Sequence, residues 1–73
     1  MVDIYKLKSQ MALKGFTQRS LAAEMGRRGM KTSENTLSSK MNGKTQFDCE
    51  DADVICEILE ITKPALKAEI FLA

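Results

Sequence analysis

The sequence of 73 residues contains no histidine and only two cysteines, Cys49 and Cys56. Without histidine, a zinc site would need other ligands at unsuitable spacings. Seven residues apart on a helix, the two cysteines would lie about 10 Å from each other, which is too far for a disulfide. We therefore expect two free thiols, in keeping with a reducing compartment, and no metal site.

The sequence also lacks the patterns that enzyme active sites use. It has no phosphate-binding glycine loop and no nucleophile placed beside a general base. Its carboxylates gather at the start of an expected helix near residues 48–53, where the helix dipole already accounts for them. We predict no catalytic residue, no enzymatic activity and no cofactor.

Strand and membrane signals are missing as well. No segment alternates with period two, and β-branched residues are sparse. The longest apolar run is the four residues 70–73, too short to span a membrane, and the charged start MVDIYKLK has no signal-peptide apolar region. We expect a soluble intracellular protein with one all-α domain over residues 1–73.

Five amphipathic segments predict five short helices. The residues that can open them are Asp3, Thr17, Ser33, Asp48 and, for the last, Thr62 with Pro64. The glycines expected to end the first three are Gly15, Gly26 and Gly43, so the second helix covers residues 18–25. The inward positions are Ile4, Leu7, Met11, Leu21, Ala22, Met25, Leu37, Met41, Ala52, Ile55, Ile58, Leu59, Leu66, Ile70 and Phe71. Helices this short are marginal alone in water, so they must pack together, with Phe16 and Phe47 at the joints.

Charge is distributed unevenly along the chain. Residues 1–46 hold nine Lys and Arg against three acids, a net charge of +6, whereas residues 47–73 hold two Lys against seven acids, a net charge of −5. A cationic front half suits a polyanion, and an acidic back half discourages docking in the wrong orientation. The alternative is solvated surface charge that happens to segregate.

The second and third expected helices form the pattern of a helix-turn-helix. Ala22 is small where a crossing helix needs close approach, and Leu37 is apolar where the next helix must enter the core. The chain resembles the phage repressor/Cro-like helix-turn-helix family, also called the XRE family. The resemblance rests on Phe16-Thr17-Gln18, Leu21-Ala22, Met25-Gly26, Thr36-Leu37-Ser38, Met41-Asn42-Gly43-Lys44, Ile55-Cys56-Glu57-Ile58-Leu59-Glu60-Ile61-Thr62 and Glu69-Ile70-Phe71. It implies a five-helix, lambda-repressor-like DNA-binding domain.

One feature departs from the family. About six residues usually separate the glycine that closes the second helix from the buried apolar residue of the third, but Gly26 and Leu37 are eleven apart. The extra residues, roughly 27–31, extend the turn, which is tolerated because loop closure costs little entropy per added residue. Met30 indicates that this segment packs against something, as an extra helical turn would.

The resemblance implies which residues meet DNA, because in this family the third helix lies in the major groove. With Leu37 and Met41 inward, the expected base-reading residues are Gln18, Glu34, Asn35, Ser38 and Ser39. The expected phosphate contacts are Arg19, Arg27, Arg28, Lys31, Lys40, Asn42 and Lys44. Alternatives stay open: Glu34 as a favourable first-turn charge, Gln18 and Lys44 as solvated side chains, and residues 27–31 as a mobile cationic loop or a source of a minor-groove arginine.

The function implied is a sequence-specific regulator of transcription, of phage or mobile-element type and more often a repressor. A module this small needs a homodimer on a palindromic operator, with recognition helices about 34 Å apart. Ile70, Phe71 and Leu72, or the fourth helix, are candidates for the dimer surface; pure core is the alternative for them. The alternative function is a protein-interaction module, an antitoxin or antirepressor of the same fold. The resemblance places the protein in the cytoplasm of a bacterial host, associated with the nucleoid.

Overall fold

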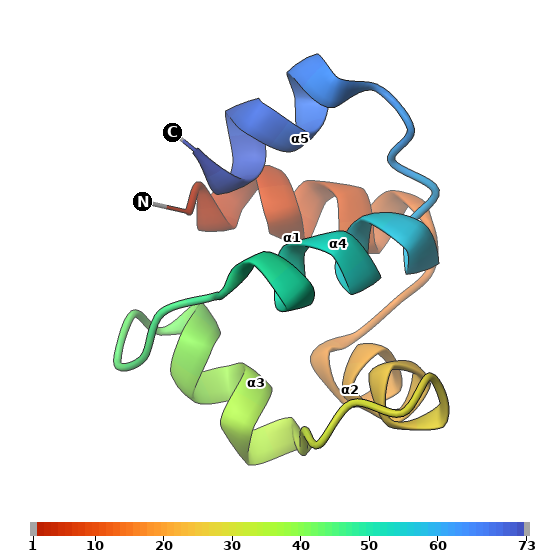
Figure 1. Ribbon diagram of the computed structural model, residues 1–73, viewed down its shortest axis with the longest axis vertical. Coiled ribbons are helices and arrows are strands. Elements are labelled where there is room, and N and C mark those ends of the chain that lie inside the picture. The colour runs from red at the N-terminus through yellow and green to blue at the C-terminus, as the bar shows by residue number, and fades with distance from the viewer. Residues whose placement is uncertain (1, 73) are drawn as a thin grey trace.

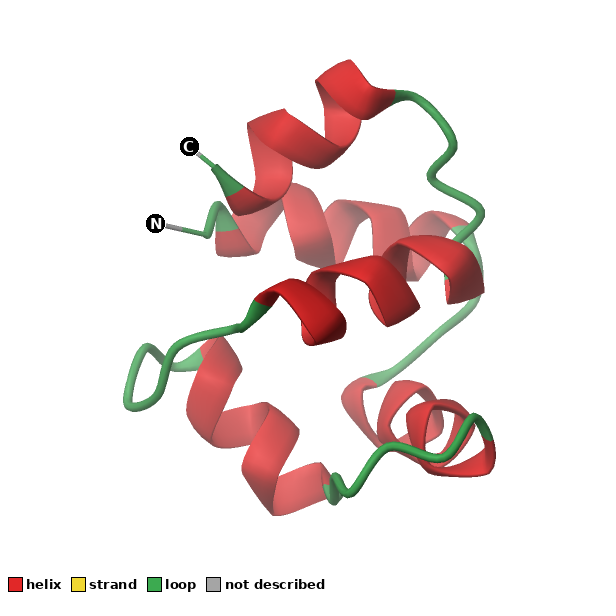
Figure 2. Cartoon of the chain, in the orientation of Figure 1, coloured by secondary structure: helices red, strands yellow, loops and turns green. Residues whose placement is uncertain are grey.

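The computed structural model describes residues 2–72, which form five α-helices and no strand (Figures 1 and 2). The helices are α1 Ile4–Leu13, α2 Gln18–Arg27, α3 Glu34–Met41, α4 Cys49–Ile58 and α5 Pro64–Phe71. In Figure 1, α2 and α3 form one end of the molecule, α1 and α5 form the other, and α4 lies between them. The predicted all-α, five-helix fold is confirmed.

Four helices begin at the capping residues that the sequence predicts. The side chains of Asp3, Thr17, Ser33 and Asp48 each accept a hydrogen bond from the backbone N–H three residues later, over 2.8 to 3.2 Å. Helix α5 differs, because Lys63 precedes it without a side-chain cap and Pro64 occupies its first turn. The role expected for Thr62 as a cap is therefore wrong, while that of Pro64 is confirmed, since proline needs no N–H partner at this position.

Four helices end in the same backbone motif. A residue in the left-handed region follows each helix, and the next N–H bonds back to a carbonyl five residues earlier. These 6→1 hydrogen bonds are Phe16 to Met11, Met30 to Met25, Lys44 to Ser39 and Ile61 to Cys56. The left-handed residues are Gly15, Gly29, Gly43 and, alone without being glycine, Glu60 at φ 56°.

The end of α2 corrects one prediction. Gly26 was expected to stop the helix, but α2 continues through Arg27, and Gly29 at φ 92° is the stopping residue. The reason is that a glycine ends a helix only where the following chain can complete the motif, and Met30 supplies the apolar residue that accompanies it. The extra residues of the connection therefore lengthen α2 by part of a turn, and residues 28–33 link it to α3.

One core unites the five helices. Leu7, Leu21, Leu37, Ile55, Leu59 and Ile70 are fully buried, so every helix contributes at least one side chain to it. Phe16, Met30 and Phe47 are partly buried against this core, as expected for side chains at the joints. The Phe47 and Phe71 rings meet edge to face with centroids 6.0 Å apart. Since Ile70 and Phe71 are buried, they are core residues and are not free to form a dimer surface.

The two ends of the fold are joined. The N–H of Asp3 donates to the carbonyl of Ile70 over 2.6 Å, and Lys6 lies 3.6 Å from Glu69, so α1 and α5 run side by side at their ends. Nowhere between residues 2 and 72 does a helix combine the length and the apolar character that crossing a bilayer requires.

Candidate nucleic-acid interface

Helix α3 presents a polar face because two of its side chains anchor it. Leu37 and Met41, one turn apart, are 0% and 3% exposed, which fixes the inward side of the helix. Asn35, which is exposed, and Ser39, which is half-buried, then point away from the core, with the half-buried Ser38 at the edge of this face. Glu34 lies near the line of the two anchors and is exposed because it is the first residue of the helix. Together these residues carry one acid, one amide and two hydroxyls, which are groups that pair with base edges in a major groove.

Helix α2 begins with Gln18 and Arg19. Thr17 and Ser20 form a reciprocal capping box, which satisfies backbone donors at this end and holds the first turn in place. Gln18 is half-buried and Arg19 is exposed. Because α2 packs directly on α3, its first turn and the outward face of α3 belong to one helix-turn-helix unit.

Arg27 is the last residue of α2, and Arg28 follows it as the C-terminal cap. Of the expected cationic turn over residues 27–31, Arg27 is therefore helical, while Arg28 begins the link to α3. Arg28 lies 3.3 Å from the Glu24 carboxylate and 3.5 Å from that of Glu57 on α4, and Arg27 lies 3.6 Å from Glu24. Both guanidinium groups therefore have protein carboxylates as neighbours, and Arg28 points toward α4.

Lys40 also has an internal partner. Its ammonium donates to the carboxylate of Asp51 in the first turn of α4, and the side chains are 16% and 2% exposed. We expected Lys40 to contact phosphate, but its charge is directed into the protein, so we no longer assign it to DNA. The same Asp51 oxygen accepts the backbone N–H of Asp48 over 3.0 Å.

Asp51 is a buried partner of the predicted site residues that sequence reasoning missed. It is the one buried charged residue within positions 2–72. The available signal was its place three residues after Asp48, which is the spacing of a capping box, and the structure shows both reciprocal hydrogen bonds. The N–H of Asp51, with a smaller contribution from the charge of Lys40, lowers the pKa of Asp48 below its ordinary 3.8.

Three predicted phosphate-binding cations remain unpaired within residues 2–72: Arg19, Lys31 and Lys44. All three are exposed. Arg19 lies at the start of α2, Lys31 in the link before α3 and Lys44 in the loop after α3. In sequence, the three cations therefore lie on both sides of α3. Asn42 caps α3 at its C-terminus, and its amide lies 3.4 Å from the Ser38 hydroxyl, so it is held near the outward face of this helix.

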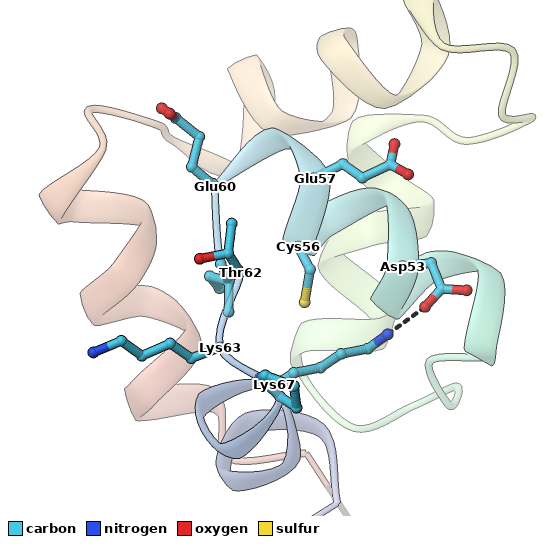
Figure 3. Close-up of a pocket in the computed structure, with 9 residues that line it drawn as sticks. Asp53, Cys56, Glu57, Glu60, Thr62, Lys63 and Lys67 are labelled. Carbon is cyan, nitrogen blue, oxygen red and sulfur yellow. Dashed lines mark hydrogen bonds and ion pairs between the residues drawn. The ribbon is translucent and has the colours of Figure 1, made fainter.

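A shallow groove on the other side of α4 is a separate feature (Figure 3). It runs between the C-terminal half of α4 and the start of α5, where Lys67 bonds to Asp53 and Cys56 lines the wall. The hydrogen bond to Asp53 raises the pKa of Lys67, and burial raises the pKa of the Cys56 thiol. None of the expected base-reading residues lines this groove, so it lies outside the candidate interface.

An outward polar helix, locked onto a second helix and supported by three more, defines a helix-turn-helix DNA-binding domain. Residues 6–65 match the family model of the Cro/C1-type HTH DNA-binding domain, and the chain belongs to this family. The predicted resemblance to the XRE-type family is confirmed. The protein is thus a double-stranded DNA-binding regulator of transcription. Comparison with curated proteins and with solved structures found no match.

Proposed function

We propose that this protein is a repressor, of phage or mobile-element type, that reads a palindromic operator as a homodimer. The observation that carries the proposal is the outward face of α3, where Asn35, Ser38 and Ser39 are displayed beside the exposed Glu34 of the first turn, while Leu37 and Met41 hold the helix. A side chain fixed in this way can be presented to a base edge with defined geometry, whereas one on a mobile loop cannot.

The individual roles follow from the chemistry of each group. Asn35 can pair bidentately with adenine, and Glu34 can accept a hydrogen bond from cytosine N4. Ser38, Ser39 and Gln18 supply polar contacts of broader tolerance. Arg19, Lys31 and Lys44, together with the Asn42 amide, hold the phosphates on either side and set the register of α3 in the groove.

A dimer surface has to lie away from this face. Because Ile70 and Phe71 are core residues, the remaining apolar candidates at the joined ends of α1 and α5 are Tyr5 and Leu72, which are 87% and 79% exposed. We place the contact between protomers there. A palindromic site requires the two recognition helices to face the same side of the duplex about 34 Å apart, so the two protomers must meet at an angle that keeps both α3 helices on the DNA side. A bacterial cytoplasmic location follows for a protein that acts on the chromosome.

The test is selection of bound fragments from genomic DNA at two salt concentrations, with sedimentation of the protein free and on the selected site. We expect an inverted repeat, a steep loss of affinity with salt, and two protomers per site. Absence of any sequence preference would refute the regulator. A selected site without inverted symmetry, bound by one protomer, would refute the dimer alone. Reporter expression from a promoter that carries the site distinguishes repression from activation.

A further inference from the structure

Two ion pairs connect the helix-turn-helix to α4, and they differ in burial. At the end of α2, Arg28 pairs with Glu57, where the side chains are 40% and 68% exposed. At the end of α3, Lys40 pairs with Asp51, where they are 16% and 2% exposed. We propose that the Lys40–Asp51 pair is a positioning contact: it sets the rotation of α3 about its axis and thereby the sequence specificity of the protein. This inference rests on the proposed base-reading role of α3.

Helix α3 packs on α2, and Lys40 is the side chain that ties it to α4. It is eight residues long, and its two anchors, Leu37 and Met41, lie along one line on the helix surface. Apolar packing along one line resists displacement more than it resists a small roll. Successive residues turn by about 100° around a helix, so Lys40 projects about 100° away from Met41 and holds α3 at a second point of its circumference.

The same geometry separates Lys40 from the base-reading positions. Asn35 and Ser38 lie about 140° and 160° around the helix from Lys40, close to its opposite side. A roll that Lys40 prevents would therefore move Asn35 and Ser38 across the groove floor. The placement of Asn35 and Ser38, which are proposed to contact bases, therefore depends on the rotation that Lys40 fixes.

Asp51 is suited to be the fixed partner. It lies in the first turn of α4, which is anchored by the fully buried Ile55 and by Leu59 directly after the helix. Its carboxylate also accepts the N–H of Asp48, which holds the acceptor oxygen in place before Lys40 reaches it. Within residues 2–72, Lys40–Asp51 is the one side-chain hydrogen bond between α3 and α4. The Arg28–Glu57 pair, being exposed, is the weaker of the two connections.

The substitution Asp51→Asn tests the proposal, because a purely electrostatic role and a positioning role of the pair predict opposite changes in affinity for the selected site. Asp51→Asn keeps an oxygen that can accept from Asp48 but removes the negative charge, which frees the ammonium of Lys40. If electrostatics alone mattered, this variant would bind all DNA more tightly. If the pair positions α3, affinity for the selected site falls while affinity for scrambled DNA stays the same or rises.

The experiment measures binding of the full chain to the selected duplex and to a scrambled duplex, across a range of salt. The variants are Asp51→Asn and Lys40→Met, with Lys40→Arg as the conservative replacement. Glu57→Gln and Asp53→Asn are matched controls: each removes one acid of α4, the first from the exposed pair with Arg28 and the second from a pair with α5. Helicity is recorded by circular dichroism at the assay temperature.

We expect Asp51→Asn and Lys40→Met each to lose about tenfold in affinity for the selected duplex, comparable to one base contact. Neither loses affinity for scrambled DNA, and Lys40→Met keeps the wild-type salt slope. Lys40→Arg restores binding to within about threefold, and the two controls stay within about threefold of wild type or bind more tightly.

Two results would overturn the proposal. In one, Lys40→Met weakens both duplexes equally and flattens the salt slope by about 0.9, as loss of a phosphate contact does. In the other, Asp51→Asn strengthens both duplexes. If Asp51→Asn is unfolded at the assay temperature, Lys40→Met decides between the outcomes, because its partly exposed side chain keeps its apolar stem. If the wild-type protein selects no site from genomic DNA, the proposed function itself is refuted, whatever the variants show.

Discussion

The amide of Ile61 lies 2.8 Å from the carbonyl oxygen of Cys56, and this hydrogen bond closes α4 in the same way that α1, α2 and α3 are closed. The left-handed residue of this motif, directly before Ile61, is Glu60 at φ 56°. The other three helices have glycine at the same position of the motif. A left-handed conformation costs an L-residue about 1–2 kcal/mol, and the greater freedom of glycine in the unfolded chain offsets about half of that.

Glu60→Gly is therefore expected to stabilise the protein and to raise the melting temperature by about 3 to 6 °C. Gly15→Ala is the matched control in the opposite direction, since φ is 78° there and no atom lies within 4 Å of an added Cβ. It should lower the free energy of unfolding by about 1 kcal/mol. Thermal unfolding followed by circular dichroism measures both, and a lower melting temperature for Glu60→Gly would contradict the assignment of strain.

The unpaired and paired cations should differ in their contribution to DNA binding. Lys44→Ala removes an exposed charge beside α3, and we expect it to flatten the plot of log affinity against log salt by about 0.9. Arg28→Ala removes a charge that lies against Glu24 and Glu57, so its slope should match the wild type. Titrations at four or more salt concentrations test this. Equal slopes for the two variants would show that pairing does not remove Arg28 from the interface.

Asn35→Ala should weaken binding to the selected site more than binding to unrelated DNA. Loss of one bidentate base contact corresponds to about 1–3 kcal/mol against the selected site. Binding to scrambled DNA should stay within about twofold, because phosphate contacts are untouched. Competition between the selected site and the same site altered at one base pair locates the contact. Uniform weakening on every duplex would place Asn35 outside base recognition.

Stability should depend on pH through Asp48. Its pKa in the folded state is lowered below the ordinary 3.8, so the unfolded state binds more protons in acid. The resulting stabilisation is complete above about pH 5 and is lost as the pH falls through 3.8 toward the folded pKa. Asp48→Asn retains a good capping residue but does not titrate. Below pH 4 its free energy of unfolding should therefore fall less steeply than that of the wild type, and parallel curves would refute this origin.

The two thiols should react at different rates in the native state. Cys49 is exposed, while Cys56 is buried and burial raises its pKa, so less of it is thiolate. With an aromatic disulfide reagent near pH 8, we expect one fast thiol and one slower by about tenfold or more, because the Cys56 thiol is nearly buried in the wall of the groove and is less ionised. Cys49→Ser should remove the fast phase, and a surviving fast phase would mean that Cys56 is accessible.

The features that local rules govern could be predicted from the sequence. The caps at Asp3, Thr17, Ser33 and Asp48 depend on a side chain and an amide three residues away, and the inward side of α3 depends on the spacing of Leu37 and Met41. That spacing, together with the resemblance to the family, gave the expected base-reading set on α3.

The remaining features depend on residues that are distant in sequence. Gly26 and Gly29 are both glycines that could end α2. The helix ends at Gly29 because Met30, directly after it, packs against the core. The partners of Arg28 and Lys40 lie 29 and 11 residues further along the chain, on α4. The pairs of Arg27 and Arg28 with Glu24 follow helical spacing, but the pairs that Arg28 and Lys40 make with α4 depend on how the helices pack.

The hydrogen bond between Asp3 and Ile70 holds the two ends of the described chain next to each other. The chain enters and leaves at one pole, and Figure 1 places the start of α3 at the opposite pole. A short linker between the two ends could turn the polypeptide into a circle, which could then be reopened between the exposed residues Thr62 and Lys63 of the connection between α4 and α5. The order in which the helices are translated is thus separable from the way they hold α3.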